Sequence, residues 1–399
     1  MEKINYGLFL TVVALLPYPQ ICLRYGCVIW IISWLLEGRW LSKTHLQSSI
    51  THYQFLPFLL FGLWYAWHAV SWFWAPDHGA WAWQMERYMA FGMMVPVGLW
   101  GVNKLYKSEQ ILRVLAITAW IAVPVYALTM GCIWKEQVTG MDFIAENISH
   151  IKHRLFLCTV EFLGMAAAIR VWRRRPVLLT CALLTMASIV VVSGSRQAII
   201  TIAVLAAIIL IYSLPKPYRL RYGIGIFILG LTLGIGLLSL HPRMQELGMH
   251  GLTNMRELSY WHDLRLNVWG AALQQPSDYI AYGLGGGQST DYLVKQYQAA
   301  RMPFYVTARF HAHNQYLEEM MEIGLPGLIL FLSAWLSVLL CAKKEGRRTA
   351  VILVTLIALN MFTDCFFGKF DGIAIWAVGL VLILVQSDPD RQQQPAGGA

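Results

Sequence analysis

Apolar stretches of about 18 to 22 residues recur along this chain, and they constrain its fold more than any other feature. Each is long enough to cross about 30 Å of hydrocarbon as a helix. Lipid offers no partners to backbone N–H and C=O groups, so a stretch that spans lipid must be helical. Of the 399 residues, 57% are hydrophobic and 13% are charged, whereas soluble domains carry about 25% charged residues. The sequence therefore predicts an all-α polytopic membrane protein and argues against a soluble globular protein.

The apolar stretches indicate about twelve membrane spans. Their approximate centres are Val13, Ile31, Leu60, Met94, Ile121, Leu163, Met186, Ala206, Leu229, Phe331, Leu356 and Val378. We therefore expect transmembrane helices 1–9 in residues 1–240 and transmembrane helices 10–12 in residues 323–386. A polar loop subdomain at 241–322 separates the two sets, and a solvated tail follows at 387–399.

Lysine and arginine cluster in alternate short loops, and this pattern predicts the orientation of the spans. The basic loops contain Arg39 and Lys43; Lys104 and Lys107; Arg173, Arg174 and Arg175; Lys216, Arg219 and Arg221; and Lys343, Lys344, Arg347 and Arg348. The short connections between them hold few basic residues. Because cytoplasmic loops carry the excess of positive charge, we expect both termini in the cytoplasm and residues 241–322 on the other side.

The long loop is too long to be a turn, and helix-like stretches such as Arg256 to Leu273 predict a small helical subdomain. The aromatic connection Trp72-Phe73-Trp74, with Trp81 and Trp83, lies on the same expected side. We interpret these tryptophans first as residues of the membrane interface, with carbohydrate stacking as the alternative.

The segment His311-Ala312-His313-Asn314 places titratable side chains at the end of the long loop, directly before an apolar run. In one interpretation His313 is a general base, because a neutral imidazole accepts a proton near neutral pH. In a second, His311, His313 and Glu318 bind a metal ion. No cysteine or acidic cluster nearby in the sequence completes such a shell. In a third, these side chains are interfacial polar residues without chemistry.

The seven cysteines lie mostly in or beside apolar segments and form no Cys-x-x-Cys pair, so we interpret them as small packing residues. They are Cys22, Cys27, Cys132, Cys158, Cys181, Cys341 and Cys365.

Several arginines are expected at the outer membrane boundary. Arg196 stands in Ser193-Gly194-Ser195-Arg196, Arg154 and Arg87 each lie at the start of a span, and Arg265 precedes Trp269 by four residues. Each of them alone is explained by snorkelling toward lipid phosphate. Together, beside the histidines, they favour a dianionic ligand, because guanidinium groups bind phosphate oxygens in a bidentate manner.

Local signals also predict the backbone around the histidines. Asn314 is a suitable N-cap for the helix that carries Glu318. The segment Gly324-Leu325-Pro326-Gly327 predicts a kink in that helix. The run Gly283-Leu284-Gly285-Gly286-Gly287 lacks the lysine of a nucleotide-binding loop, so we expect a turn that positions the flanking segments.

The order and spacing of these motifs resemble a known family. His311-Ala312-His313-Asn314-Gln315-Tyr316-Leu317-Glu318, with the following Glu322-x-Gly324-x-x-Gly327-Leu328, is similar to the signature of the O-antigen ligase and polymerase superfamily. Arg265-x-x-x-Trp269, the Gly283-x-Gly285 turn and Ser193-Gly194-Ser195-Arg196 resemble other motifs of that family. The resemblance is strongest to the O-antigen ligases of lipopolysaccharide biosynthesis.

This resemblance implies a glycosyltransferase-C-like membrane architecture and a glycosyltransferase activity at the periplasmic face of the bacterial inner membrane. The implied donor is an undecaprenyl-pyrophosphate-linked O-antigen, and the implied acceptor is the lipid A-core oligosaccharide. Members of the family use no metal ion or other cofactor. Nothing in the sequence suggests a nucleic-acid partner, and membrane lipid is the expected surrounding.

The resemblance also suggests roles for individual residues in an inverting transfer. His313 would take the proton from the acceptor hydroxyl, and His311 and Asn314 would orient His313 or the sugars. Arg265, Arg196, Arg154 and Arg87 would bind the donor pyrophosphate. The alternatives are an O-antigen polymerase, a protein O-oligosaccharyltransferase, and a transporter of lipid-linked glycans; a transporter would place its charges near the bilayer midplane.

Overall fold

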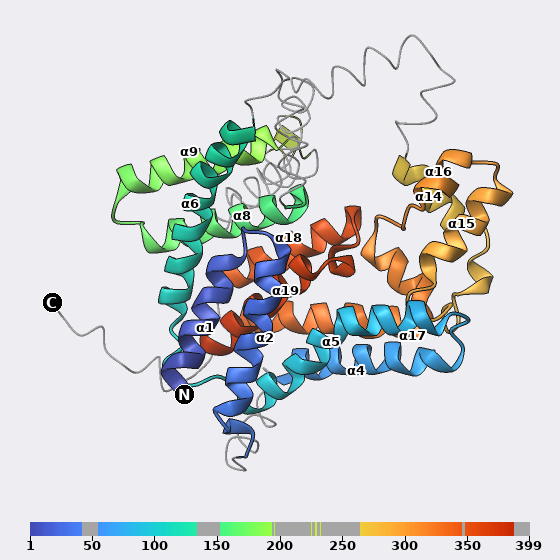
Figure 1. Cartoon of the computed structure of the whole chain (residues 1–399), viewed down its shortest axis with the longest axis horizontal. Coiled ribbons are helices and arrows are strands. Elements are labelled where there is room, and N and C mark those ends of the chain that lie inside the picture. The colour runs from blue at the N-terminus through green and yellow to red at the C-terminus, as the bar shows by residue number, and fades with distance from the viewer. Residues whose placement is uncertain are drawn as a thin grey trace, which may run out of the picture. The chain divides into compact units, whose positions relative to one another are not determined.

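The structure is a computed structural model, and it describes residues 1–41, 55–133, 152–193, 195, 264–344 and 348–386, with four isolated helical residues at 225, 228, 229 and 232. Within these ranges the chain forms thirteen α-helices, joined by loops and short 3-10 turns, and it contains no β-strand (Figure 1). The predicted all-α class is therefore confirmed for the described residues.

The chain divides into two compact units. The first unit comprises residues 1–16, 21–111 and 264–399, and the second comprises residues 17–20 and 112–263. Most helices belong to the first unit: α1 (Glu2–Leu15), α2 (Gln20–Leu36), α4 (Leu56–Val70), α5 (His78–Trp100), α14 (Leu264–Ala272), α15 (Ser289–Ala299), α16 (Pro303–Ala308), α17 (Gln315–Lys344), α18 (Arg348–Thr363) and α19 (Phe370–Gln386). The second unit contains α8 (Arg154–Val171), α9 (Pro176–Val192) and most of α6 (Ser108–Ile133).

Three helices of the described chain are long and apolar enough to cross a membrane: Gln20–Leu41, Ser108–Thr129 and Gln315–Ala342. They contain the predicted span centres Ile31, Ile121 and Phe331. Shorter apolar helices at Pro176–Val192, Val351–Thr363 and Phe370–Leu382 contain three more. The centre at Ala206 lies outside the described residues. The chain is thus a helical membrane protein, while the count of twelve spans and the side of the long loop stay predictions.

An aromatic core inside the first unit packs against the part of α17 that follows Gly324, through Phe331 and Trp335. Helix α17 packs against α4 and α18, and α4 packs against α5. Large rings from these helices and α19 meet, with ring centroids 4.9 Å apart for Phe61 and Trp376 and 4.8 Å apart for Trp64 and Phe91. Such pairs add to the free energy already gained by burying their apolar surface. This core therefore holds α17 against α4 and α19.

Helix α17 is broken at Gly324, as the sequence predicts. Its φ of +66° is left-handed, and Pro326 follows inside the helix. The glycine-rich turn fills the break, because Leu284 N–H donates to Met321 O (2.8 Å) and Gly285 N–H donates to Glu322 O (2.9 Å). A Cβ on Gly283 would lie 2.2 Å from Glu322 O. The turn thus positions its flanking segments, as expected. Only glycine, which has no Cβ, can approach the backbone of α17 at Glu322 so closely.

Helices α14, α15 and α16 form a small subdomain beside the start of α17. Its core is made of Val268, Ala271, Ala272, Tyr279, Leu293, Tyr297, Tyr305, Ala312, Leu317, Met321 and Cys365. The predicted helix over Arg256 to Leu273 is confirmed from Leu264 onward, and its earlier part lies outside the described residues. Ala312, in the middle of the histidine segment, is completely buried in this core. The subdomain therefore anchors that segment.

Candidate active site

The histidine segment forms a short loop between α16 and α17. Asn314 Oδ1 accepts a hydrogen bond from Leu317 N–H (3.1 Å), so Asn314 caps α17 as predicted. His313, just before the cap, has a left-handed backbone with φ +47°. Few residues other than glycine adopt this conformation without cost, and such positions cluster at functional sites.

The two imidazole rings lie against each other, with centroids 4.0 Å apart. His313 N–H donates to Nδ1 of His311 (3.2 Å). Because an amide N–H only donates, Nδ1 of His311 is the acceptor, and the neutral ring carries its proton on Nε2. Burial, followed by the charge of His313, lowers the pKa of His311 below its ordinary value. His311 is therefore held as a neutral acceptor beside His313.

Asp364 joins the histidines from the loop between α18 and α19. Its Oδ1 lies 3.5 Å from Nδ1 of His313 and 4.0 Å from Nε2 of His311. On the far side of the His313 ring, Nε2 is buried and has no hydrogen-bond partner among the described residues. A carboxylate at Nδ1 favours the tautomer that leaves the Nε2 lone pair open. His313 is thus arranged as an acceptor for a proton that no described residue supplies.

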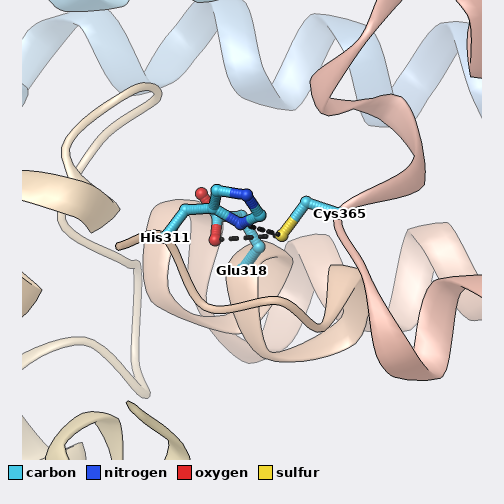
Figure 2. A group of neighbouring side chains, drawn as sticks. All are labelled: His311, Glu318 and Cys365. Atoms are coloured by element: carbon cyan, nitrogen blue, oxygen red, sulfur yellow. Dashed lines mark hydrogen bonds between the residues drawn. The ribbon is translucent and has the colours of Figure 1, made fainter. Parts of the chain in front are cut away.

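A thiol, an imidazole and a carboxylate meet on the other side of His311 (Figure 2). Cys365 Sγ lies 3.2 Å from His311 Nδ1 and 3.4 Å from Glu318 Oε2. Ala312 N–H also donates to that oxygen (3.2 Å). Burial, with the nearby charges of Glu318 and Asp364, raises the pKa of the Cys365 thiol well above its ordinary value. The cysteine is therefore a neutral thiol in this arrangement.

Glu318 also belongs to a second group of polar side chains. Ser289, at the start of α15, lies within hydrogen-bond distance of both Glu318 Oε1 (2.5 Å) and Glu322 Oε1 (3.1 Å). Gln84 of α5 donates to Glu322 Oε2 (3.3 Å). A single hydroxyl proton serves only one carboxylate at a time. These contacts tie α15 and α5 to the first turns of α17.

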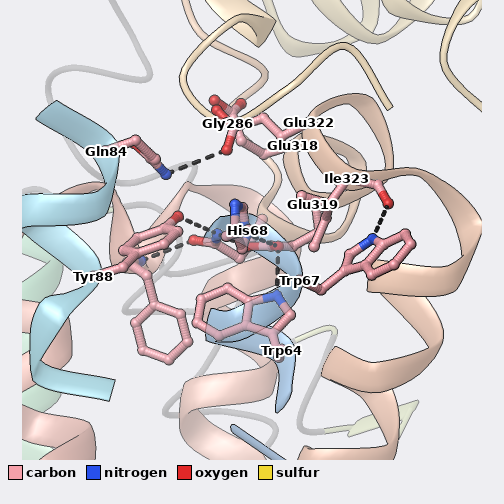
Figure 3. Close-up of polar contacts among 12 residues, drawn as sticks. Trp64, Trp67, His68, Gln84, Tyr88, Gly286, Glu318, Glu319, Glu322 and Ile323 are labelled. Atoms are coloured by element: carbon pink, nitrogen blue, oxygen red, sulfur yellow. Dashed lines mark hydrogen bonds and ion pairs between the residues drawn. The ribbon is translucent and has the colours of Figure 1, made fainter. Parts of the chain in front are cut away.

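Glu319 points to another face of α17 and is enclosed by α4 (Figure 3). Trp64 Nε1–H donates to its Oε2 (2.8 Å), and His68 Nε2 lies 3.0 Å from the same oxygen. Gln315 donates to Oε1 (2.7 Å), and its own Oε1 accepts from Phe367 N–H (2.8 Å). Glu319 and His68 are fully buried. Both carboxylate oxygens are therefore satisfied inside the protein.

Helix α14 braces the two loops that carry the site. Arg265 and Trp269 are four residues apart and so lie on one face of the helix. Arg265 Nε–H donates to Thr363 O (3.0 Å), next to Asp364, and Trp269 Nε1–H donates to Ala312 O (2.9 Å). Arg265 is an exposed residue. The predicted Arg-x-x-x-Trp motif thus reaches both the aspartate loop and the histidine loop.

Of the other predicted arginines, Arg87 is described in the unit that carries the histidines. The Arg87 guanidinium stacks on the Trp83 ring, 3.6 Å from its centroid, and its Nη1 donates to Gly368 O (2.9 Å). It therefore holds the loop that follows Cys365. Arg154 begins α8, which belongs to the second unit, and Arg196 lies outside the described residues.

The sequence interpretation missed two members of the site, Asp364 and Cys365. Cys365 is buried, as expected of a packing residue, but its thiol contacts His311 and Glu318 instead of only apolar groups. No acid or cysteine nearby in the sequence completes a shell around the histidines, but the fold brings two groups of possible ligands together: His311, Glu318 and Cys365; and His311, His313 and Asp364. The two overlooked residues lie about 50 positions downstream of the histidines; Cys365 and His311, for example, are 54 residues apart. One signal was available: both lie in a short polar interruption between two apolar runs.

The fold and site together define a helical membrane protein whose polar site combines a histidine pair, an aspartate and an arginine at one end of a kinked helix. Residues 181–332 match the family model of O-antigen ligase, which confirms the superfamily resemblance of the motifs. The matched segment includes Arg196, Arg265 and the histidine loop, whereas Asp364 and Cys365 lie beyond it. No curated protein matches the chain. The family supports a membrane glycosyl-transfer function with a lipid-linked glycan donor and a lipid acceptor.

Proposed function

We propose that this protein is an O-antigen ligase that transfers O-antigen from undecaprenyl pyrophosphate to a sugar hydroxyl of lipid A-core. The observation that carries this proposal is the state of His313, which lies inside the matched segment. Its Nδ1 faces Asp364 at 3.5 Å, while its Nε2 has no hydrogen-bond partner among the described residues. This is the arrangement that a general base requires before its substrate binds.

In the proposed reaction, Nε2 of His313 takes the proton of the acceptor hydroxyl. The hydroxyl oxygen attacks the anomeric carbon of the donor sugar and forms the new C–O bond with inversion. The bond between that carbon and the pyrophosphate oxygen breaks, and undecaprenyl pyrophosphate leaves with the electron pair. Asp364 stabilises the imidazolium that forms, since its carboxylate lies on the Nδ1 side. His311 accepts the N–H of His313 and Asn314 caps the helix that follows, and we propose that both orient the His313 ring or the sugars.

Negative charge develops on the leaving pyrophosphate, and fixed cations would stabilise it more in the transition state than in the ground state. Arg265 is the leading candidate, because its Nε contact with Thr363 O fixes its side chain beside the aspartate loop. Arg196 is its proposed partner in the family motif. Arg154 and Arg87 have a weaker case, since Arg87 is already engaged with Trp83 and Gly368. Arginine alone can neutralise the pyrophosphate, so the proposed transfer needs no metal ion.

Two members of the same superfamily and one other class compete with this proposal. An O-antigen polymerase or a protein O-oligosaccharyltransferase would use the same base and differ in the acceptor. A transporter of lipid-linked glycans would need its charged residues near the bilayer midplane. The histidine loop instead precedes the first turn of α17, at one end of a candidate span. This position favours an enzyme that acts at a membrane face.

A transfer assay tests the proposal. Purified protein in detergent is mixed with undecaprenyl-pyrophosphate-linked O-antigen and with lipopolysaccharide that lacks O-antigen, in the presence of a chelator. We expect a ladder of O-antigen-bearing lipopolysaccharide on a gel. Elongated lipid-linked glycan without transfer to lipid A-core would indicate a polymerase, and transfer to a protein acceptor would indicate an oligosaccharyltransferase. Movement of intact donor across vesicle membranes without any transfer would indicate a transporter.

We also propose that residues 241–322 face the periplasm and that both termini are cytoplasmic. Gln298, exposed on α15, is a suitable reporter, whereas the nearby Ser289 is buried against Glu318. The Gln298→Cys variant, with the exposed native cysteines Cys22 and Cys181 changed to serine, should react with an impermeant maleimide in intact spheroplasts. Reaction only after lysis would reverse the orientation and remove the periplasmic site.

A further inference from the structure

The thiol–imidazole–carboxylate group of His311, Cys365 and Glu318 has no task in the proposed transfer beyond holding His311. It nevertheless offers one nitrogen, one sulfur and one oxygen donor, all within 4.8 Å of one another (Figure 2). Borderline-soft divalent cations bind this combination of donors. The group combines segments far apart in the chain, since His311 and Cys365 are 54 residues apart.

The spacing of the donors suits a tetrahedral ion. Zinc ligands lie about 2.0–2.3 Å from the metal, which separates two ligand atoms by about 3.3–3.6 Å. Here Cys365 Sγ lies 3.2 Å from His311 Nδ1 and 3.4 Å from Glu318 Oε2. Both separations are within a few tenths of an ångström of the values that an ion would impose. The third separation, between the imidazole nitrogen and the carboxylate oxygen, is no more than 4.8 Å, so side-chain movements must bring these two donors closer for all three to bind one ion.

The protonation of the imidazole also suits a metal ligand. The backbone N–H of His313 points at Nδ1 of His311, so this nitrogen is unprotonated, and a cation that displaces the N–H can take its lone pair. The Cys365 thiol is within reach of two acceptors, and it has only one proton to donate. When a cation binds, that proton leaves to solvent and the thiolate binds the ion together with Nδ1 and Oε2.

We propose that His311, Cys365 and Glu318 form a binding site for a Zn²⁺-class divalent cation, and that its occupation inhibits transfer. The inhibitory half rests on the proposed role of His313 as general base. The His313 ring lies 4.0 Å from the His311 ring, so an ion held by His311 lies next to the proposed base. The ion also competes with His313 N–H for Nδ1, which loosens the left-handed turn.

Binding is tested without any activity measurement. The purified full-length protein is titrated with Co²⁺, and thiolate-to-cobalt charge transfer is followed in the near-ultraviolet. We expect about one equivalent of Co²⁺ to give the band in the wild type, and Zn²⁺ to displace it. Cys365→Ser should lose the band, and Glu318→Gln should weaken Co²⁺ binding at least about tenfold. The matched control is Cys341→Ser, which removes another buried cysteine and should keep the band.

An equal band in Cys365→Ser would assign the thiolate to another cysteine and overturn the proposal, as would the absence of a band in the wild type. If Cys365→Ser fails to fold, a second measurement replaces it: Zn²⁺ should slow the reaction of Cys365 with a thiol reagent in the wild type, detected by mass spectrometry of the labelled peptide. Unchanged labelling of Cys365 in saturating Zn²⁺ would also overturn the site.

Transfer assays then separate this proposal from the proposed function. In each variant, the rate with Zn²⁺ is compared with that variant's own rate in EDTA. We expect Zn²⁺ to inhibit the wild type and the half-inhibitory concentration to rise at least about tenfold in Cys365→Ser. A wild type that loses activity in EDTA and regains it with Zn²⁺ would overturn the inhibitory role, although the cobalt band would persist. A protein that gives the band but never transfers glycan would leave the metal site standing and remove the ligase proposal.

Discussion

Glu318 and Glu319 are neighbours near the start of α17, yet they belong to two different regions of the molecule. Glu319 enters a closed network in which Trp64, His68 and Gln315 satisfy both carboxylate oxygens. Glu318 faces an open cluster with the thiol of Cys365 and the two histidines, where Nε2 of His313 has no partner among the described residues. Successive side chains on an α-helix point about 100° apart, so Glu318 and Glu319 lie on different faces of α17.

This difference separates structural polar groups from functional ones. A buried carboxylate whose two oxygens are both paired stabilises one arrangement of the helices. In the Glu319 network, Nδ1 of His68 is nevertheless buried without a hydrogen-bond partner among the described residues, so the contrast rests on the two carboxylates and on His313. An unpaired polar atom costs free energy, and native proteins retain such atoms mainly where a ligand or a reaction uses them. Substitutions in the closed network should therefore change stability, and substitutions in the open cluster should change transfer.

The largest expected effect follows from His313→Ala in the open cluster. Removal of a general base typically slows a reaction about 10²–10⁴-fold. We expect transfer to fall by that amount while the thermal midpoint in detergent stays within a few degrees of the wild type. His311→Ala should have a milder effect on transfer. The reverse order of the two variants would identify His311 as the base.

In the closed network, Glu319→Ala should mainly lower the stability of the protein, whereas His313→Ala should mainly slow transfer. Trp64, His68 and Gln315 would each lose their acceptor inside the protein, and breaking such a buried pair costs about 3–5 kcal/mol. We expect a large drop in the thermal midpoint of the purified protein. Glu319→Gln is the matched control, because it keeps the size and one acceptor oxygen and should be milder. Wild-type stability in Glu319→Ala would abolish the distinction between the two regions.

Arg265 tests whether the open cluster extends to a phosphate site. If it binds the leaving pyrophosphate, Arg265→Lys should lose about 10²–10³-fold in transfer, nearly as much as Arg265→Ala, because an ammonium does not reproduce bidentate contacts. If Arg265 only anchors α14 at lipid headgroups, Lys should restore nearly full activity. The same comparison at Arg196 tests its proposed partner.

Asp364→Asn should have an intermediate effect on the open cluster. The amide keeps the shape of the side chain but removes the charge that faces Nδ1 of His313. Groups that orient a functional histidine typically contribute about 10–100-fold, so we expect transfer to slow by that factor with stability little changed. Steady-state rates across the acceptor concentration range should show the loss mainly in kcat. A loss confined to KM would instead place Asp364 in acceptor binding.

The smallest expected effect comes from Gly283→Ala, in the turn that joins the two regions. Its φ of +81° is left-handed, and the new Cβ would lie 2.2 Å from Glu322 O. The conformation alone costs about 1–2 kcal/mol for a residue other than glycine. We expect lower thermal stability, with Gly270→Ala as the control because nothing lies within 4 Å of its Cβ. Equal thermal midpoints for Gly283→Ala and Gly270→Ala would mean that the backbone of the turn shifts to accept the new Cβ at little cost in stability.

Much of this arrangement follows from local sequence patterns. The helical class, the Asn314 cap, the Gly324 kink and the Arg265–Trp269 face depend on residues within one turn or one helix, so spacing alone predicts them. Asp364 and Cys365 reach His311 only through the packing of α17 against α18, and no local pattern encodes that contact. The partnership of Glu319 with His68 spans 251 residues and was missed for the same reason.

The enclosed Glu319 has a consequence for how the protein is made. A candidate span that begins with three carboxylates within eight residues is costly to insert alone, because a charge without partners is unfavourable in hydrocarbon. The ribosome delivers α4, with Trp64 and His68, 251 residues before Glu319 emerges. The donors are thus already synthesised when α17 reaches the bilayer. A circular permutant that starts at α17 would reverse this order and present the carboxylates to lipid before any partner exists.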